Sequence, residues 1–378
     1  MKLIHLSDLH LGKRVNEFSM IEDQEYILKQ ILSIVKKEEP DAVLIAGDIY
    51  DKSVPSVEAV GLFDDFLKGL ARRKPRVFII SGNHDSPERL SFAAELIELG
   101  GIHIAPVYNG VVKPVRLRDE YGSVNIYMLP FLKPAHVRSV FPEETVESYT
   151  DAVRVAVSHM ELAESERNLL ITHQFVTGAA RSDSEELSAG GTDNVDGSVF
   201  DAFDYVALGH LHGPQSVGRE TLRYCGSPLK YSFSEAAQIK SVTVLDWAEK
   251  GDLRIRTEAL KPLRDLREIK GTYEELVNRK NYEGTRTDDY LHITLTDEED
   301  VVDAMRKLQV IYPNLMKLDY DNRRTRENRA VIGGEEEGSK TPLELIRDFY
   351  EKQNNQAMSE KQEALVSELT ESIWEESL

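Results

Sequence analysis

Short apolar runs alternate with loops and helix-like segments through the first two thirds of the chain. The runs are rich in Val, Ile and Leu and have the length of buried β-strands: KLIHL, DAVLIAGD, RVFIISGN, VNIYMLP, NLLITHQ, YVALGH and SVTVLDW. Between them, apolar residues in segments 24–37 and 57–71 recur every three or four positions, which predicts two amphipathic helices. The pattern up to about Pro262 therefore predicts an α/β domain whose helices cover a buried sheet.

The hydrophobic pattern changes after Pro262. Residues 290–295 and 315–319 alternate as strands, and residues 298–310 repeat as a helix, which predicts a small βαβ-type domain. Residues 323–341 are polar and contain glycines, which is typical of a linker. The predicted parts of the chain are a main domain at 1–262, a small domain at 263–322, a linker at 323–341 and a helical tail at 342–378.

The tail carries two apolar stripes at helical spacing, which belong to no domain of their own. One interpretation is that they pack back onto the main body. The other, which we favour, is that they dock on a partner protein, because exposed stripes of this size mark interaction sites. The predicted partner-binding residues are Leu343, Ile346, Phe349, Leu365, Leu369 and Ile373.

The composition of the 378 residues is that of a globular protein, with 41% hydrophobic and 30% charged residues. No apolar stretch approaches the roughly 20 residues that cross a bilayer, and the N-terminus resembles a core strand and not a signal peptide. A single cysteine, Cys225, excludes an intramolecular disulfide. We therefore expect a cytoplasmic protein. The net charge of -20 argues against non-specific nucleic-acid binding, although bound cations can still attract phosphate locally.

Five of the predicted strands end in side chains that bind metal ions. In open α/β sheets, ligands bind outside the carboxyl ends of the strands, so these side chains are expected to converge on one crevice. Any one histidine is more often structural, but five strand ends with the same feature are hard to explain by chance. The candidate ligands are Asp8, His10, Asp48, Asn83, His173, His210 and His212.

Seven donors are too many for one open catalytic ion. They suit two ions about 3.5–4 Å apart that share a carboxylate, and Asp48 on the turn after Gly47 is the natural bridge. Two carboxylates against two divalent ions leave a net charge of about +2, which attracts a phosphate diester. The mixed nitrogen and oxygen donors favour Mn2+, allow Fe or Zn2+, and disfavour Mg2+ and Ca2+.

His84 and Asp85 follow the candidate ligand Asn83 directly. A histidine that a carboxylate orients is a suitable general acid for a leaving alkoxide, so we predict catalytic roles for both residues. The glycines in AGD, SGNHD and LGHLH permit turns that other residues resist. The remaining histidines lack the strand-end context and are expected to be structural: His5, His103, His136, His159 and His292.

Taken in order, Asp-x-His, Gly-Asp, Gly-Asn-His-Asp, a later His and Gly-His-x-His resemble the motifs of the calcineurin-like metallophosphoesterase superfamily. The resemblance implies a four-layer α/β/β/α sandwich, with a bimetal site at the strand ends and His84 as the catalytic histidine. It assigns Asp48 to both ions. It implies one ion held by Asp8, His10, Asp48 and His212, and another held by Asp48, Asn83, His173 and His210.

Further stretches, GDIYDKSVPS, SGNHDSPERL, LPFLKPAHVR and YCGSPLKYSFSE, resemble one branch of that superfamily, the nuclease subunits of bacterial SbcCD complexes. This branch implies Mn2+-dependent 3′–5′ double-strand exonuclease and single-strand or hairpin endonuclease activity in DNA repair, recombination and replication. It also implies a DNA-capping second domain, a tail that binds the SbcC-type coiled-coil ATPase, and a homodimer within a two-plus-two complex. Archaeal and eukaryotic relatives carry a second active-site histidine where this chain has Asp51, so that role does not transfer.

Two other functions remain open at this point. A stand-alone metallophosphatase or cyclic-nucleotide phosphodiesterase would use the same bimetal centre on small phosphoesters. A non-enzymatic scaffold would only position a partner ATPase, but it has no use for the complete donor set or for His84. Hydrolysis of duplex DNA compared with small phosphodiesters separates the three.

Overall fold

The computed structural model describes residues 1–185, 193–326, 346–347, 350, 358–359, 361–363 and 365–366. The chain divides into two compact units. The first consists of Met1–Glu268, Arg286–His292 and Tyr312–Lys317, and the second of Ile269–Thr285, Ile293–Ile311 and Leu318–Leu378. The predicted domain boundaries stay predictions.

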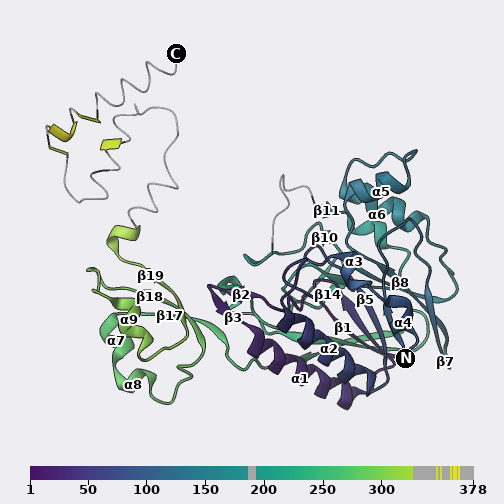
Figure 1. Cartoon of the computed structure of the whole chain (residues 1–378), viewed down its shortest axis with the longest axis horizontal. Helices are drawn as coiled ribbons and strands as arrows, with labels where there is room; N and C mark the ends of the chain where they lie inside the picture. Colours follow the sequence, from purple (N-terminus) through teal and green to yellow (C-terminus); the bar gives the residue numbers. More distant parts are fainter. Residues whose placement is uncertain are drawn as a thin grey trace. The chain divides into compact units, whose positions relative to one another are not determined.

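Two sheets, each with six strands within the described residues, form the centre of the first unit (Figure 1). In each sheet four consecutive strands are parallel, and the outer pairings are antiparallel. The first sheet has the order β16 (Leu253–Ala259), β15 (Ser241–Trp247), β1 (Lys2–Leu6), β4 (Ala42–Ala46), β5 (Arg76–Ile80) and β6 (Ile102–Ile104). The second has the order β13 (Gln215–Val217), β14 (Arg219–Tyr224), β12 (Tyr205–Gly209), β9 (Arg167–His173), β8 (Gly122–Leu129) and β7 (Val115–Asp119).

The buried side chains of the first unit form three separate cores. Alternate residues of a strand point to opposite faces of its sheet. Ile4 therefore packs under α1 (Ile21–Glu38) and α2 (Val57–Ala71), whereas its neighbour Leu3 packs between the two sheets. On the far face of the second sheet, Leu170 belongs to the core that includes α5 (Pro134–Val140) and α6 (Tyr149–Ser158). The helices cover the two outer faces (Figure 1), which confirms the predicted α/β/β/α sandwich.

The two helices that the sequence predicts in this unit are present. Helix α2 has the predicted bounds, and the Ser56 side chain caps it by accepting a hydrogen bond from the Ala59 N–H at 3.2 Å. Helix α1 is longer than predicted by three residues at its start and one at its end. The smaller elements are β2 (Arg14–Val15), β3 (Phe18–Ser19), α3 (Pro87–Leu90), α4 (Ala94–Glu98), β10 (Phe175–Val176), β11 (Asn194–Val195) and the 3-10 helices η1 (Gly197–Phe200) and η2 (Phe233–Glu235).

A further sheet has the order β17 (Leu266–Gly271), β18 (Tyr290–Leu295) and β19 (Leu315–Tyr320), and the boundary between the two units falls within each of these strands. The helices of the second unit are α7 (Tyr273–Val277), α8 (Arg279–Tyr282) and α9 (Ala304–Gln309) within the described residues. The strand predicted at 290–295 has the observed bounds. The helix predicted at 298–310 is wrong in its first half, because Asp303 takes a left-handed backbone with φ of 54° and α9 starts only after it.

Most of the predicted tail lies outside the described residues, and so do Leu343, Phe349, Leu369 and Ile373. Of the predicted partner-binding residues that are described, Ile346 and Leu365 are exposed. In the part of the chain that the structure describes, we find no helix with the length and apolarity needed to span a membrane.

Candidate metal centre

The predicted ligands lie at the carboxyl ends of parallel strands from both sheets. Asp8 follows β1, Asp48 follows β4, and Asn83 follows β5 in the first sheet, whereas His173 ends β9 and His210 follows β12 in the second. Because parallel strands end at the same edge, each sheet delivers its donors to one side of the sandwich. The second sheet fixes this register directly, since Gly209 pairs with His173.

The first group of donors contains Asp8, His10 and His212, whose ligand atoms lie within 4.8 Å of one another. His10 Nε2 and His212 Nε2 are 3.0 Å apart. Two nitrogens that each bind one ion at about 2.1 Å stand about 3 Å apart when they subtend a right angle. The spacing of these two nitrogens therefore fits ligands of one shared ion.

The second group is centred on Asn83. Its side-chain oxygen Oδ1 lies 3.0 Å from His173 Nε2 and 3.0 Å from His210 Nδ1. Asp48 stands between the two groups, because its Oδ2 is 3.6 Å from His10 Nε2 and 3.3 Å from His173 Nε2. The structure thus brings all seven predicted donors into one cluster, with a single carboxylate oxygen facing both halves.

The donors other than Asn83 are almost completely buried, and this determines their protonation. Burial lowers the pKa of His10, and it lowers the pKa of His210 to about 3, so both rings are neutral at neutral pH. Burial raises the pKa of Asp8 to about 6. Burial also opposes ionisation of Asp48 and His173, but their mutual attraction outweighs it, lowering the pKa of Asp48 and raising that of His173 to about 9. Ligands bind a metal in their deprotonated form, so a divalent cation at this site would replace the proton that His173 holds beside Asp48.

Four of the predicted donors have a strained backbone, as do six other non-glycine residues in the described part of the chain. Asp8, His10, Asp48 and His210 have φ values of 53°, 44°, 49° and 103°. L-residues rarely adopt positive φ, and each such residue costs of order 1–3 kcal/mol, which the surrounding structure has to supply. The sequence pattern does not reveal this strain, because it places the unusual turns on the glycines.

Comparison with known proteins identifies the family. Residues 1–214 match the calcineurin-like phosphoesterases, and residues 262–354 match the family described as the type 5 capsule protein repressor C-terminal domain. The chain is 35% identical over 373 residues to the D subunit of the nuclease SbcCD of Staphylococcus epidermidis, which covers 98% of both chains. The chain belongs to the SbcD family of calcineurin-like phosphoesterases. Among solved structures, a dimetal phosphatase from Danio rerio and a protein of Thermus thermophilus are each 12% identical, with TM-scores of 0.41 and 0.37. They cover 69% and 68% of this chain, which in turn covers 96% and 98% of theirs.

In this SbcD-family chain, Asp85 does not orient His84 as predicted from the sequence. The Asp85 carboxylate accepts hydrogen bonds from the backbone N–H groups of Ile49, Tyr50 and Gly82, at 3.1, 2.9 and 2.9 Å. His84 Nδ1 instead lies 3.0 Å from the carbonyl oxygen of Asp51. The buried Asp85 therefore ties together the turns after β4 and β5, and the direct partner of His84 is a backbone carbonyl.

His84 remains next to the donor cluster. Its ring lies edge-on to that of His10 with the centroids 4.8 Å apart, and its backbone N–H donates to Asp48 Oδ1 at 3.0 Å. Because the carbonyl of Asp51 only accepts, Nδ1 of His84 carries a hydrogen. His84 is partly exposed, like Asn83 and unlike the other six donors. A ring nitrogen of His84 lies within 4.8 Å of ligand atoms of His10 and Asp48, a spacing at which these three side chains could hold an ion.

Asp51 lies on the turn after β4, beside His10 and His84. Its carboxylate pairs with Lys13 Nζ at 2.7 Å, and the same oxygen lies 3.6 Å from His10 Nδ1. Asp51 thus faces the side of the His10 ring that points away from Asp48. It connects His10, Lys13 and, through its carbonyl, His84.

The segment YCGSPLKYSFSE, on which the family resemblance partly rests, contacts the backbone between the donors Asp8 and His10. The Tyr231 hydroxyl donates to the carbonyl of Leu9 at 2.6 Å and accepts from Gln24 Nε2 at 3.1 Å. Glu235 pairs with Lys240, and both are buried. The sequence showed no chemical reason for these residues, because their partners are distant in the chain.

Gly82 and Gly209 are required because they have no side chain, and not because of their backbone conformation. A Cβ on Gly82 would stand 2.1 Å from Asp48 Oδ1, and one on Gly209 would stand 1.8 Å from the carbonyl oxygen of Ala46. Neither has a positive φ, whereas Gly47 does, at +88°. The turn argument therefore holds for Gly47, while Gly82 and Gly209 allow close packing around the donors.

Proposed function

We propose that the chain is a Mn2+-dependent DNA phosphodiesterase, a 3′–5′ double-strand exonuclease and single-strand or hairpin endonuclease. We propose that it works with an SbcC-type coiled-coil ATPase in DNA repair and recombination. The observation that carries the proposal is the match to the D subunit of the nuclease SbcCD over 98% of both chains. The donor cluster supports it independently, because such a cluster suits hydrolysis of a phosphate ester.

The residues that would hold the ions are the seven clustered donors. In this proposal His10 and His212 belong with Asp8, whereas His173 and His210 belong with Asn83, and Asp48 serves both. Two bound divalent ions would polarise a phosphoryl oxygen and lower the pKa of water. The mixed imidazole and carboxylate donors favour Mn2+ over Mg2+ or Ca2+.

In the proposal, His84 supplies the proton for the leaving oxygen. Its Nδ1–H donates to the carbonyl of Asp51, which fixes the ring and leaves Nε2 as the position from which a proton is transferred. Partial exposure gives His84 access to a substrate, and histidine is the side chain that most often serves as a general acid.

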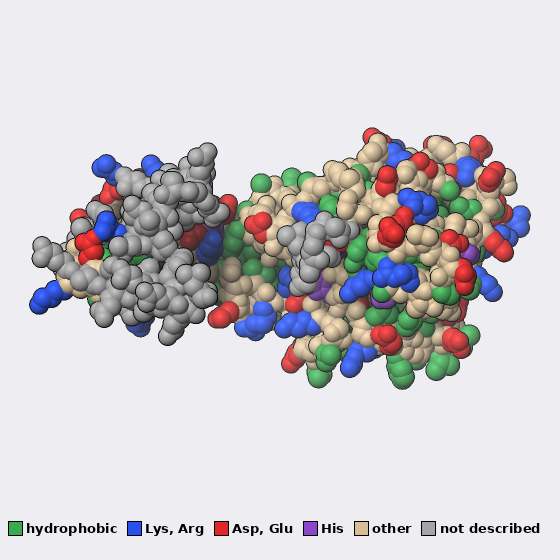
Figure 2. All heavy atoms as spheres, turned by 90° about the horizontal axis from the view of Figure 1, so that it is seen from above, with side chains coloured by type: hydrophobic (Ala, Val, Ile, Leu, Met, Phe, Trp, Pro, Cys, Tyr) green, Lys and Arg blue, Asp and Glu red, His purple; other side chains and the backbone are tan. Residues whose placement is uncertain are grey.

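Charge around the cluster favours a phosphate substrate despite the acidic chain. Two carboxylates, Asp8 and Asp48, against two divalent ions leave about +2 at the site. In Figure 2, histidine side chains at the surface of the first unit have Lys, Arg, Asp and Glu side chains around them, so the positive charge in this proposal comes from the ions. A local positive field of this kind attracts the DNA backbone even though the net charge of the chain is -20.

One experiment separates the proposed nuclease from a phosphatase that acts on small esters. We would measure hydrolysis of an end-labelled duplex and of bis-para-nitrophenyl phosphate with Mn2+ or with chelator. The variants are His84→Ala and, as a matched control, His159→Ala, which removes an exposed histidine stacked on Phe141. We expect His84→Ala to lose about 10²–10⁴-fold in rate while keeping its bound metal. Loss of metal together with activity would make His84 a ligand, and small-ester cleavage without DNA cleavage, even with the ATPase present, would refute the nuclease.

The tail provides the test for the partner. Deletion of residues after Pro342 is expected to abolish association with an SbcC-type ATPase and to leave metal-dependent diester hydrolysis intact. The apolar stripe residues Leu365 and Leu369 offer a milder variant, because replacing both with glutamate removes apolar contact area without shortening the chain. Association that survives both changes would refute the docking role.

A further inference from the structure

Four polar residues that are not among the predicted donors form a hydrogen-bond network around His212. Ser184 Oγ lies 2.6 Å from His212 Nδ1, and Glu185 Oε1 accepts from the backbone N–H of His212 at 2.7 Å. Lys240 Nζ donates to the carbonyl oxygen of His212 at 2.8 Å, and Glu235 binds both Ser184 and Lys240. We call Ser184, Glu185, Glu235 and Lys240 the His212 support.

The hydrogen bonds of the support determine which nitrogen of His212 carries its proton. Ser184 has a single hydroxyl hydrogen, and Glu235 as a carboxylate only accepts. Because Ser184 Oγ lies 2.5 Å from Glu235 Oε1, it donates there and has no hydrogen left for His212. The contact between Ser184 Oγ and His212 Nδ1 therefore requires Nδ1 to be the donor. That leaves Nε2 with a free lone pair, and Nε2 is the atom 3.0 Å from His10 Nε2.

Glu235 has to be ionised for this chain of donors to hold. Burial alone would favour the neutral acid, since the residue has no exposed surface. The ammonium group of the buried Lys240 lies directly beside the Glu235 carboxylate, and this pairing favours the ionised acid. Lys240 Nζ reaches Glu235 Oε2 at 2.6 Å and also contacts Ser227 Oγ and Gln238 Oε1 at 3.0 and 2.8 Å.

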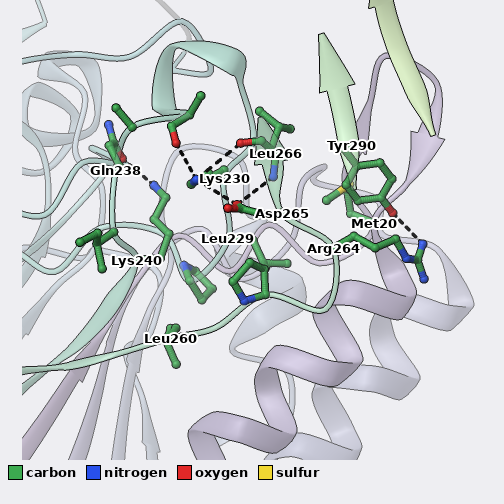
Figure 3. Close-up of a pocket in the computed structure, with 15 residues that line it drawn as sticks. Met20, Leu229, Lys230, Gln238, Lys240, Leu260, Arg264, Asp265, Leu266 and Tyr290 are labelled. Carbon is green, nitrogen blue, oxygen red and sulfur yellow. Dashed lines mark hydrogen bonds and ion pairs between the residues drawn. The ribbon is translucent and has the colours of Figure 1, made fainter. Parts of the chain in front are cut away.

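A role in stability alone explains this ion pair poorly. A buried pair usually contributes little net stability, and an apolar pair of the same volume serves a core as well or better. Lys240 also borders a cavity of about 270 Å³, with its ammonium group directed at Gln238 (Figure 3). Both members of the pair contact His212. Lys240 donates to its backbone carbonyl, and Glu235 is linked to its ring nitrogen Nδ1 through Ser184.

We infer that Glu235, acting through Ser184 and held ionised by Lys240, is a positioning residue that keeps the His212 proton on Nδ1 and presents Nε2 to one of the two metal ions. The inference rests on the proposed function in that it assumes the ion shared by Asp8, His10 and His212. It adds a reason for the GSPLKYSFSE segment: Glu235 at its end sets the tautomer of a ligand.

The test measures Mn2+ binding by the full chain, as the number of ions bound and the affinity of each by calorimetric titration. We expect Ser184→Ala to weaken one of the two ions by about 10–100-fold and to leave the other within about twofold. Ser184→Thr keeps the hydroxyl and is expected to retain near-native affinity for both. Glu235→Gln is expected to reproduce the Ser184→Ala defect, because an amide can donate to Ser184 and so release the hydroxyl hydrogen toward Nδ1.

Two controls separate positioning from structural support. Asp119→Asn breaks another ion pair, with the buried Arg167, away from the cluster, and is expected to lower stability while leaving both Mn2+ affinities unchanged. The double variant Glu235→Gln with Lys240→Met is expected to be more stable than Lys240→Met alone. It is not expected to regain the native Mn2+ affinity. Native affinity for both ions in Ser184→Ala and Glu235→Gln would overturn the inference, as would an equal loss at both sites. A native chain that binds no Mn2+ would instead refute the proposed function.

Discussion

Replacement of Gly82 by alanine is expected to disable the metal centre without touching any donor. The new Cβ would stand 2.1 Å from Asp48 Oδ1 and 2.5 Å from the Asp48 backbone nitrogen, whereas ordinary contacts begin near 3.4 Å. The carboxylate or the turn that carries Gly82 therefore has to shift by more than about 1 Å. Oδ1 also accepts the backbone N–H of His84 at 3.0 Å, so the same shift disturbs the proposed acid.

A misplacement of about 1 Å costs on the order of 10²-fold in rate, and overpacking of a buried site costs about 1–3 kcal/mol. We therefore expect Gly82→Ala to fold, to hydrolyse bis-para-nitrophenyl phosphate about 10²-fold more slowly, and to bind at least one Mn2+ more weakly. The assay combines initial rates at saturating Mn2+ with metal titration and thermal unfolding.

Gly61→Ala is the matched control. Gly61 lies in α2, and a Cβ there meets nothing within 4 Å. Because alanine is the better helix former, this variant is expected to gain about 0.5–1 kcal/mol and to keep full activity. Native rates and native Mn2+ affinity in Gly82→Ala would refute the idea that the closeness of Gly82 to Asp48 fixes the bridge.

Three further predictions concern stability. Removal of divalent ions by chelator should lower the melting temperature, since Mn2+ at 100 times its Kd contributes about 2.7 kcal/mol per site; an unchanged melting curve would contradict metal binding. Tyr231→Phe should lose about 1–3 kcal/mol in denaturant unfolding, because the buried carbonyl of Leu9 loses its shorter hydrogen bond and keeps only that from Gln24 Nε2 at 3.4 Å; a smaller loss would mean that Gln24 moves closer and replaces the hydroxyl. Burial opposes ionisation of Asp119, but Arg167 and the N-terminal amine outweigh it and lower its pKa to about 2. This stabilisation is complete above the ordinary pKa near 3.8 and is lost as pH falls toward 2. Asp119→Asn should therefore cost about 1–2 kcal/mol at pH 7, with solvent screening included, and the difference should shrink in acid; a difference independent of pH would contradict the pairing.

Positions that follow a local rule were predictable from the sequence. The strand ends at Asp8, Asp48 and His173 could be found because apolar runs mark the strands and parallel strands end on one edge. Helix α2 could be bounded because Ser56 precedes a regular apolar repeat. The family resemblance then assigned the donors to two groups, and the geometry around Asn83 is compatible with that division.

Features that depend on distant partners were not predictable. The neighbour of His84 in sequence is Asp85, but the Asp85 carboxylate accepts hydrogen bonds from three backbone amides. The His84 ring donates to the carbonyl of Asp51 instead. Glu235 and Lys240 show no periodicity that would link them to His212. In the second unit, the acidic run before α9 has helical spacing, yet Asp300 pairs with Arg324 and Asp303 breaks the helix.

The central claim is that one cluster of seven donors makes the chain a metal-dependent nuclease. Its most direct test is cleavage of an end-labelled DNA duplex by the purified chain with an SbcC-type ATPase, ATP and Mn2+. The native chain would be compared with Asp48→Ala and with a chelator-treated sample. We predict shortening of the duplex that chelator abolishes and that Asp48→Ala loses together with bound Mn2+. Cleavage that survives either treatment, or an intact duplex under conditions where the native chain hydrolyses small diesters, would contradict the claim.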